Sequence, residues 1–187
     1  MKKSIITIAG ELGSGKSSTA KRIAAELGYE HFSSGDLFRA VADERGLSLE
    51  EANRQAEQEP SIDFAVDDRL KKLGEQDRLV VDSRLAFHWI PSSFKVFLAL
   101  DPEMAAERIF NHIQKEGRVG ESGNSVDEIL RSIVSRRESE RKRYMTLYGV
   151  DTLDLSAFDL TTDTSNTSLD NVAEKVKTSY QSWLAKD

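Results

Sequence analysis

The chain has 187 residues, which is the length of about one domain. Hydrophobic residues make up 39% of it and charged residues 31%, a balance that excludes disordered and fibrous classes of protein. The net charge of −6 argues against binding to a nucleic-acid polymer. Because the chain has no Cys, a disulfide scaffold, a thiolate zinc site and a cysteine nucleophile are excluded.

No apolar run in the sequence reaches the length of a membrane span, and the apolar stretch at residues 5–9 is too short for a signal peptide. The sequence also has no internal repeat, low-complexity tract or linker-like stretch. We therefore expect residues 1–187 to form a single domain, monomeric and without a membrane partner. A cytoplasmic location is expected, since the lack of Cys fits a reducing compartment.

The first part of the chain alternates between strand and helix patterns. A β-branched run over residues 4–9 predicts a strand that is buried on both faces and ends at Gly10. Apolar residues at helical spacing follow and predict a helix that stops at Gly28. Residues 29–33 are consistent with a second strand.

The middle of the chain is helical and heavily charged. Residues 36–75 have a helical pattern with breaks near Gly46 and Pro60. Two apolar runs, at residues 79–81 and 94–100, predict the third and fourth strands.

The last part of the chain predicts three further helices and one weak strand. The helices cover residues 102–116, 125–148 and 169–183, and a segment with three Gly at 117–124 predicts a mobile loop between the first two. The weak fifth strand lies near residues 152–155. Strands that alternate with helices predict a three-layer α/β/α fold with a five-stranded parallel sheet.

A phosphate-binding loop is the strongest signal in the sequence. Residues 10–17, GELGSGKS, match G-x-x-x-x-G-K-[ST] between a predicted strand and a predicted helix, which indicates a fold of the P-loop NTPase type. Its backbone amides would surround phosphate oxygens, Lys16 would reach the β- and γ-phosphates of ATP, and the Ser17 hydroxyl would bind Mg²⁺. The expected nucleotide-binding residues are Gly10, Glu11, Leu12, Gly13, Ser14, Gly15, Lys16, Ser17 and Ser18.

Asp82 ends the third predicted strand, where a Mg²⁺-binding carboxylate of the Walker B type is expected. The alternative is an ordinary Asp at the end of a strand, and the phosphate loop makes the Mg²⁺ role the better interpretation. Residue 83 is Ser rather than an acid that would activate water, and the sequence lacks the Asn-Lys-x-Asp signature of common GTPases. Both absences favour phosphoryl transfer to a second substrate over nucleotide hydrolysis.

Charged residues interrupt the apolar stripe of the helix predicted at 125–148. The stripe starts at Ile129 and Ile133 and resumes at Leu147, but between these positions it passes through Arg136, Arg137, Glu140, Arg141 and Arg143. A solvated helix with i,i+4 ion pairs is the alternative. An anionic ligand bound against this face of the helix explains better why the apolar stripe resumes afterwards. The loop at 117–124 would then be a lid that closes over the reacting phosphates and excludes water.

Two further arginines follow predicted strand ends, where open parallel sheets bind ligands. They are Arg39 and Arg84, and either one alone fits a surface position equally well. The three histidines, His31, His88 and His112, have no metal-ligand spacing and are interpreted as packing or surface residues.

These residues together resemble the nucleoside monophosphate kinases, and specifically the short type of cytidylate kinase. The resemblance runs from the phosphate loop through segments 33–39 (SSGDLFR), 80–85 (VVDSRL) and 136–144 to residues 158–160. The phosphate loop is shared by very many families, whereas segment 33–39 and the Arg-rich helix are much more specific. The sequence departs from the family at Ser83, where Gly is usual, and lacks the insertion of the longer bacterial enzymes.

The resemblance implies roles for individual residues. It implies a helical monophosphate-binding region at about residues 36–76, the lid at about 117–124, and Mg²⁺ ligation by Ser17 and Asp82. It implies that the monophosphate is bound by Ser34, Asp36, Arg39, Arg84, Arg136, Glu140 and Arg143. The catalytic set that it implies is Lys16, Asp82, Arg84, Arg108 and Arg141.

The expected reaction is transfer of the γ-phosphoryl group of ATP to CMP or dCMP with the help of Mg²⁺. A kinase for UMP or AMP stays open, as does a kinase for dephospho-coenzyme A or a small alcohol. An alcohol would need a carboxylate base, for which Asp36 is the best candidate. The third alternative is a nucleotide-binding module without turnover, which would bind ATP and release no ADP with any acceptor.

Overall fold

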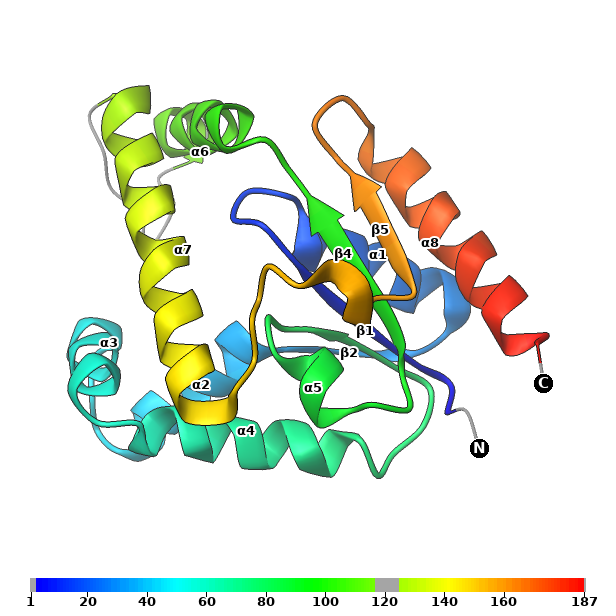
Figure 1. Cartoon of the computed structure of the whole chain (residues 1–187), viewed down its shortest axis with the longest axis horizontal. Helices are drawn as coiled ribbons and strands as arrows, with labels where there is room; N and C mark the ends of the chain where they lie inside the picture. Colours follow the sequence, from blue (N-terminus) through cyan, green and yellow to red (C-terminus); the bar gives the residue numbers. More distant parts are fainter. Residues whose placement is uncertain (1–2, 117–124, 187) are drawn as a thin grey trace.

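The computed structural model describes residues 3–116 and 125–186. Its five strands form a parallel sheet in the order β2-β3-β1-β4-β5 (Figure 1), as the alternating pattern predicts. The first strand is central because helices cover both faces of its β-branched run, and every residue from Ile5 to Ala9 is buried. The strands are β1 (Ile5–Gly10), β2 (Glu30–Ser33), β3 (Leu79–Asp82), β4 (Phe94–Ala99) and β5 (Leu160–Asp163).

Two helices cover one face of the sheet, α1 (Lys16–Leu27) and α8 (Leu169–Leu184). As predicted, α1 ends at Gly28, whose φ of 65° is in the left-handed region and whose amide bonds the carbonyl of Ala24. The core on this face is formed by Ile6, Ile8, Ala20, Ile23, Val80, Val96, Leu98, Val172, Val176 and Tyr180.

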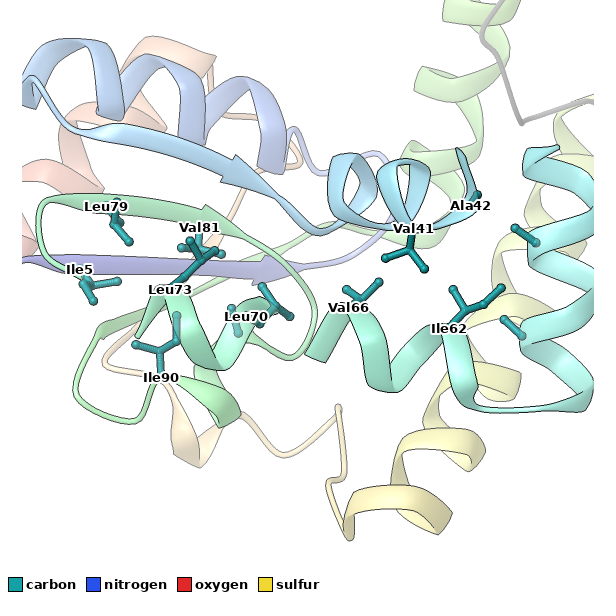
Figure 2. Packing of buried hydrophobic residues seen from close by; sticks show 13 residues of the cluster. Ile5, Val41, Ala42, Ile62, Val66, Leu70, Leu73, Leu79, Val81 and Ile90 are labelled. Carbon is teal, nitrogen blue, oxygen red and sulfur yellow. The ribbon is translucent and has the colours of Figure 1, made fainter. Parts of the chain in front are cut away.

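The other face is covered by the helices of the predicted 36–75 region and by one short helix. They are α2 (Ser34–Glu44), α3 (Leu49–Gln58), α4 (Ser61–Leu73) and α5 (Ala86–Trp89), and no periodic pattern predicts the last of them. The predicted breaks separate α2 from α3 and α3 from α4. Helix α4 is central to this layer because Ile62, Val66 and Leu70 pack in the same cluster as Val41 of α2 and the strand residues Ile5, Leu79 and Val81 (Figure 2).

A pair of long helices, α6 (Pro102–Glu116) and α7 (Val126–Tyr148), stands beside the carboxyl ends of the strands (Figure 1). Small and branched residues join them, since Ala105, Ala106 and Ile109 pack with Ile129 and Ile133. The predicted lid at 117–124 lies outside the described residues. Neither these helices nor any other in the described ranges is long and apolar enough to cross a membrane.

The position predicted for the fifth strand is wrong. Residues 152–155 lead into a 3₁₀ helix, η1 (Leu155–Ala157), because the side chain of Asp154 accepts a hydrogen bond from the amide of Ser156 and closes a turn. The strand lies at 160–163, where it pairs with β4 along the sheet edge. Its signal is weak because only Thr162 in it is buried.

Gly10, the last residue of β1, should be the least replaceable of the glycines in residues 3–116 and 125–186. A Cβ there would lie 2.3 Å from the carbonyl oxygen of Leu98, and the φ of 149° is unfavourable for other residues. We expect Gly10→Ala to lower the free energy of unfolding well beyond Gly28→Ala, which costs about 1 kcal/mol for the left-handed backbone alone. Denaturant unfolding of both variants checks this, and equal losses would contradict it.

Candidate active site

The loop after β1 has the backbone of a phosphate cradle. Gly10, Gly13 and Gly15 all have positive φ, at 149°, 74° and 82°, which residues with a side chain rarely adopt. Gly15 is also the N-cap of α1, so the loop leads directly into the positive end of that helix dipole. Ser17 and Ser18 are exposed in its first turn. The loop therefore has the geometry that the motif predicts.

Lys16 lies inside this loop. Its Nζ donates a 2.6 Å hydrogen bond to the carbonyl oxygen of Glu11. Burial, together with the nearby charge of Arg84, lowers the pKa of Lys16 to about 7, although Asp82 and Glu11 act in the opposite direction. The ammonium group is thus short of negative charge, which a bound phosphate would supply.

Asp82 lies at the end of β3 with its carboxylate buried. The Ser33 hydroxyl donates to one oxygen at 3.2 Å, and His31 Nε2 lies 3.2 Å from the other. Within residues 3–116 and 125–186, no group of three or more His, Asp or Glu side chains could hold a metal ion unaided. The Asp82 carboxylate and the Ser17 hydroxyl are nevertheless the hard oxygen donors that Mg²⁺ prefers, so the residues fit an ion completed by nucleotide phosphates and water.

The contact of His31 with Asp82 was not predicted, because the sequence indicated only a packing or surface residue. Strands β2 and β3 are neighbours with Ser33 opposite Asp82, so residues two apart on β2 both reach that carboxylate. The order of strands in the sheet supplies this contact, and spacing along the chain carries no signal for it.

Arg84 lies two residues beyond Asp82 and forms an ion pair with Glu140 of α7. Glu140 also accepts a 3.0 Å hydrogen bond from Arg136. Burial lowers the pKa of Arg84 to about 10, and the nearby cations Arg136 and Arg143 add to the effect. One carboxylate therefore holds two guanidinium groups beside the phosphate loop.

A cleft separates the phosphate loop from α7 and from segment 152–158. Glu11, Arg84, Arg137 and Glu140 contribute its charged lining, and Phe87, Phe97 and Phe158 its aromatic wall. Arg137 and Glu11 approach each other to 3.4 Å across it. Two residues of the polar stretch of α7, Arg137 and Glu140, thus line a cleft, and the binding role of the stretch stays a prediction.

Four further predicted residues lie on α7 and α2. Arg143 of α7 lies 3.7 Å from Asp63 of α4. Arg39 forms an ion pair with Asp36 in the first turn of α2, where both side chains are exposed, and Ser34 is the first residue of the same helix.

Arg108 and Arg141 contact segments other than the phosphate loop. Arg108 donates to the carbonyl oxygens of Thr164 and Ser165 at 2.7 Å each. Arg141 lies on the outer side of α7 and makes a two-pronged ion pair with Asp151 at 2.8 and 2.7 Å. The structure does not bring these two arginines together with Lys16, and their catalytic roles stay predictions.

The pKa of Lys16 predicts how the stability of the ligand-free protein depends on pH. Lys16 has its ordinary pKa of 10.5 when unfolded and one of about 7 when folded, so the unfolded chain binds more protons between these values. The penalty for burying its charge is therefore complete below pH 7 and fades towards pH 10.5. We expect Lys16→Met to stabilise the protein most at about pH 6 and least at about pH 10.

Chemical denaturation in the presence of a chelator and without nucleotide measures this difference. Lys21→Met, on the exposed side of the same helix, is the control and should show no such trend. A gain from Lys16→Met that is the same at both pH values would contradict the prediction.

Solved structures of small-molecule kinases have a similar fold. The shikimate kinase from Bacteroides thetaiotaomicron aligns with a TM-score of 0.65 at 17% identity, covering 97% of this chain and 98% of that one. A gluconokinase from Sinorhizobium meliloti aligns with a TM-score of 0.57 at 15% identity and full coverage of both chains. At such identities the likeness shows the fold alone.

Proteins related in sequence identify the family of this chain. The cytidylate kinase of Methanothrix thermoacetophila is 39% identical, covering 86% of this chain and 88% of that protein. The cytidylate kinase of Methanopyrus kandleri is 34% identical, covering 98% and 96%. The model of the cytidylate kinase-like family matches residues 5–166, which include the phosphate loop, Asp82 and α7. The chain therefore belongs to the cytidylate kinase-like family.

Proposed function

We propose that this protein transfers the γ-phosphoryl group of ATP to CMP or dCMP and releases ADP with CDP or dCDP. One observation supports this reaction above the others: the phosphate loop with Lys16 adjoins a cleft lined by Arg84 and Arg137, and Arg136 shares Glu140 with Arg84. Such a site can hold two polyanions end to end. The relatives named cytidylate kinase support cytidine nucleotides as the acceptors.

The phosphate loop would hold ATP. The positive φ angles of its glycines would let the backbone amides point towards the phosphates. Lys16 would give up its hydrogen bond to the Glu11 carbonyl and bind phosphate oxygens instead. Mg²⁺, held by Ser17 and Asp82, would supply further neutralisation of the transferring group. His31 and Ser33 keep the Asp82 carboxylate in a fixed orientation towards that position.

The arginines would hold and orient the acceptor. The phosphate of a monophosphate is already ionised, so the reaction needs no strong general base. Arg84 and Arg136 now share Glu140, and a phosphate dianion entering beside them offers more oxygens in bidentate geometry. Positioning and charge neutralisation are thus the main contributions of this chain.

An alcohol acceptor is the main alternative, since the similar solved structures include shikimate kinases and a gluconokinase. An alcohol must lose a proton to a base during transfer. Asp36, the carboxylate considered for this role, is exposed and engaged by Arg39. Asp36 would have to leave Arg39 before it could take a proton from an alcohol, so this pairing supports a phosphate acceptor.

The acceptor assignment is tested by ADP release from ATP and Mg²⁺ with CMP, dCMP, UMP, AMP, GMP, shikimate and gluconate offered separately. We expect CMP or dCMP to be strongly preferred. Arg39→Ala should then lower kcat/KM for it about tenfold to a hundredfold, the value of one or two charged hydrogen bonds. If none of the monophosphates stimulates ADP release, the proposal is contradicted. The alternatives are then an alcohol kinase or a nucleotide-binding module without turnover.

We also propose that Arg141 neutralises the transferring group once both substrates are bound, which requires it to leave Asp151. Arg141→Ala should then lower kcat by about a hundredfold or more. Asp151→Asn should leave kcat nearly unchanged, because it releases the guanidinium group without removing it. If both variants lower only the free energy of unfolding and neither changes kcat, Arg141 is an anchor for residues 149–152 instead.

A further inference from the structure

The pair formed by Asp63 of α4 and Arg143 of α7 is partly buried and lacks hydrogen bonds at the two atoms that face each other. In the described part of the chain, Asp63 Oδ2 and Arg143 Nε are buried atoms without a hydrogen-bond partner, and they lie 3.7 Å apart. The Asp63 side chain is 14% exposed. Burial raises the pKa of its carboxyl group, and Arg143 offsets only part of that rise. A buried carboxylate oxygen without a donor is costly, and substrate could supply one.

The neighbouring carboxylate on the same helix shows the contrast. Asp67, one turn further along α4, accepts hydrogen bonds from Trp89 of α5 at 3.0 Å and from the Tyr148 hydroxyl of α7. It joins three helices, and each of its oxygens accepts a hydrogen bond within the fold. Asp63 has the same type of side chain in the same layer, yet the fold leaves one of its oxygens unused.

The backbone beneath Asp63 is held firmly. Ile62 and Val66, on either side of it in the sequence, are buried against α2 and the cluster on this face of the sheet (Figure 2). The Cα and Cβ atoms of Asp63 are therefore fixed relative to the sheet. A carboxylate held in this way is suited to recognition, because little order has to be created when a ligand binds.

The pair also lies further along α7 than the residues that contact Arg84. Along α7, Arg136 and Glu140 face Arg84 near the phosphate loop, and Arg143 follows one turn beyond Glu140. Seven residues of helix span about 10 Å, which is similar to the distance from the phosphate of a nucleotide to the far edge of its base. If the phosphate is held at Arg84 and Arg136, the base reaches Arg143 and Asp63.

We propose that Asp63 accepts a hydrogen bond from the 4-amino group of the acceptor base and, together with Arg143, selects cytosine over uracil. This inference rests on the proposed function. The recognition edge of cytosine presents a donor at N4 and acceptors at N3 and O2. A carboxylate beside a guanidinium group presents the complementary acceptor and donors.

Uracil fits the same pair poorly. Its O4 is an acceptor where cytosine has a donor, so O4 would face the carboxylate oxygen of Asp63 with no proton between them. Its N3 carries a hydrogen and would oppose the donors of Arg143. Sites built to bond a polar group reject analogues that leave the buried partner unpaired, and one such base contact contributes about 1–3 kcal/mol of discrimination.

The test compares the wild type with Asp63→Asn. The side-chain amide of this variant can take either orientation, so it can accept from N4 of cytosine or donate to O4 of uracil. We expect the ratio of kcat/KM for CMP over UMP to fall about tenfold to a hundredfold, mainly through the KM for CMP. Calorimetric binding of CMP and UMP without ATP should show the same change in ratio.

Asp67→Asn is the matched control. It removes a carboxylate from the same helix and should lower the thermal stability of the protein, because Asp67 joins α4, α5 and α7. The CMP-to-UMP ratio should stay at the wild-type value. If Asp63→Asn lowers kcat/KM for CMP and UMP by the same factor, Asp63 only holds Arg143 and the inference is overturned.

A second measurement does not depend on the folding of any variant. The wild type is offered a CMP analogue in which hydrogen replaces the 4-amino group, and we expect kcat/KM about tenfold or more below that for CMP. Equal use of CMP and this analogue would overturn the role of Asp63 while leaving the cytidylate kinase activity in place. A wild type that uses no pyrimidine monophosphate would instead overturn the proposed function itself.

Discussion

Concentrating positive charge in one cleft is the constraint on which the rest of this structure depends. Lys16, Arg84, Arg136 and Arg137 converge on the edge of the sheet where β1 and β3 end, and burial already lowers the pKa of the first two. Such a group of cations repels itself unless anions are interleaved. The chain supplies these anions from different elements, with Glu11 in the phosphate loop and Glu140 on α7.

Helix α7 shows how this constraint is met without loss of the fold. Its first turns are fixed by Ile129 and Ile133 against α6. Its last turn is fixed by Tyr148, which bonds Asp67 and packs against Trp89. The two ends provide the packing, so the middle turns can carry arginines towards the cleft. A helix with a fully apolar inner face would pack along its whole length and would have no site.

Much of the site could be predicted from the sequence because its signals are local. The phosphate loop, Asp82 and Arg84 each follow a strand directly, and the interrupted stripe of α7 has a helical period. Contacts between elements had no such signal. His31 reaches Asp82 only because β2 and β3 are neighbours, and Asp63 meets Arg143 only because α4 and α7 come together. The fifth strand was misplaced for a related reason, since an edge strand buries too few residues to produce a pattern.

Glu140 holds two guanidinium groups before any acceptor arrives, and this has a consequence for binding thermodynamics. A phosphate that enters the cleft does not add ion pairs to bare cations but replaces pairs that already exist. The total number of charge contacts changes little, and the expelled carboxylate must regain its water. Acceptor affinity should therefore depend on ionic strength far less than the number of arginines around the cleft suggests. Selectivity then rests on how well the phosphate fits the positions of the arginines rather than on the total positive charge.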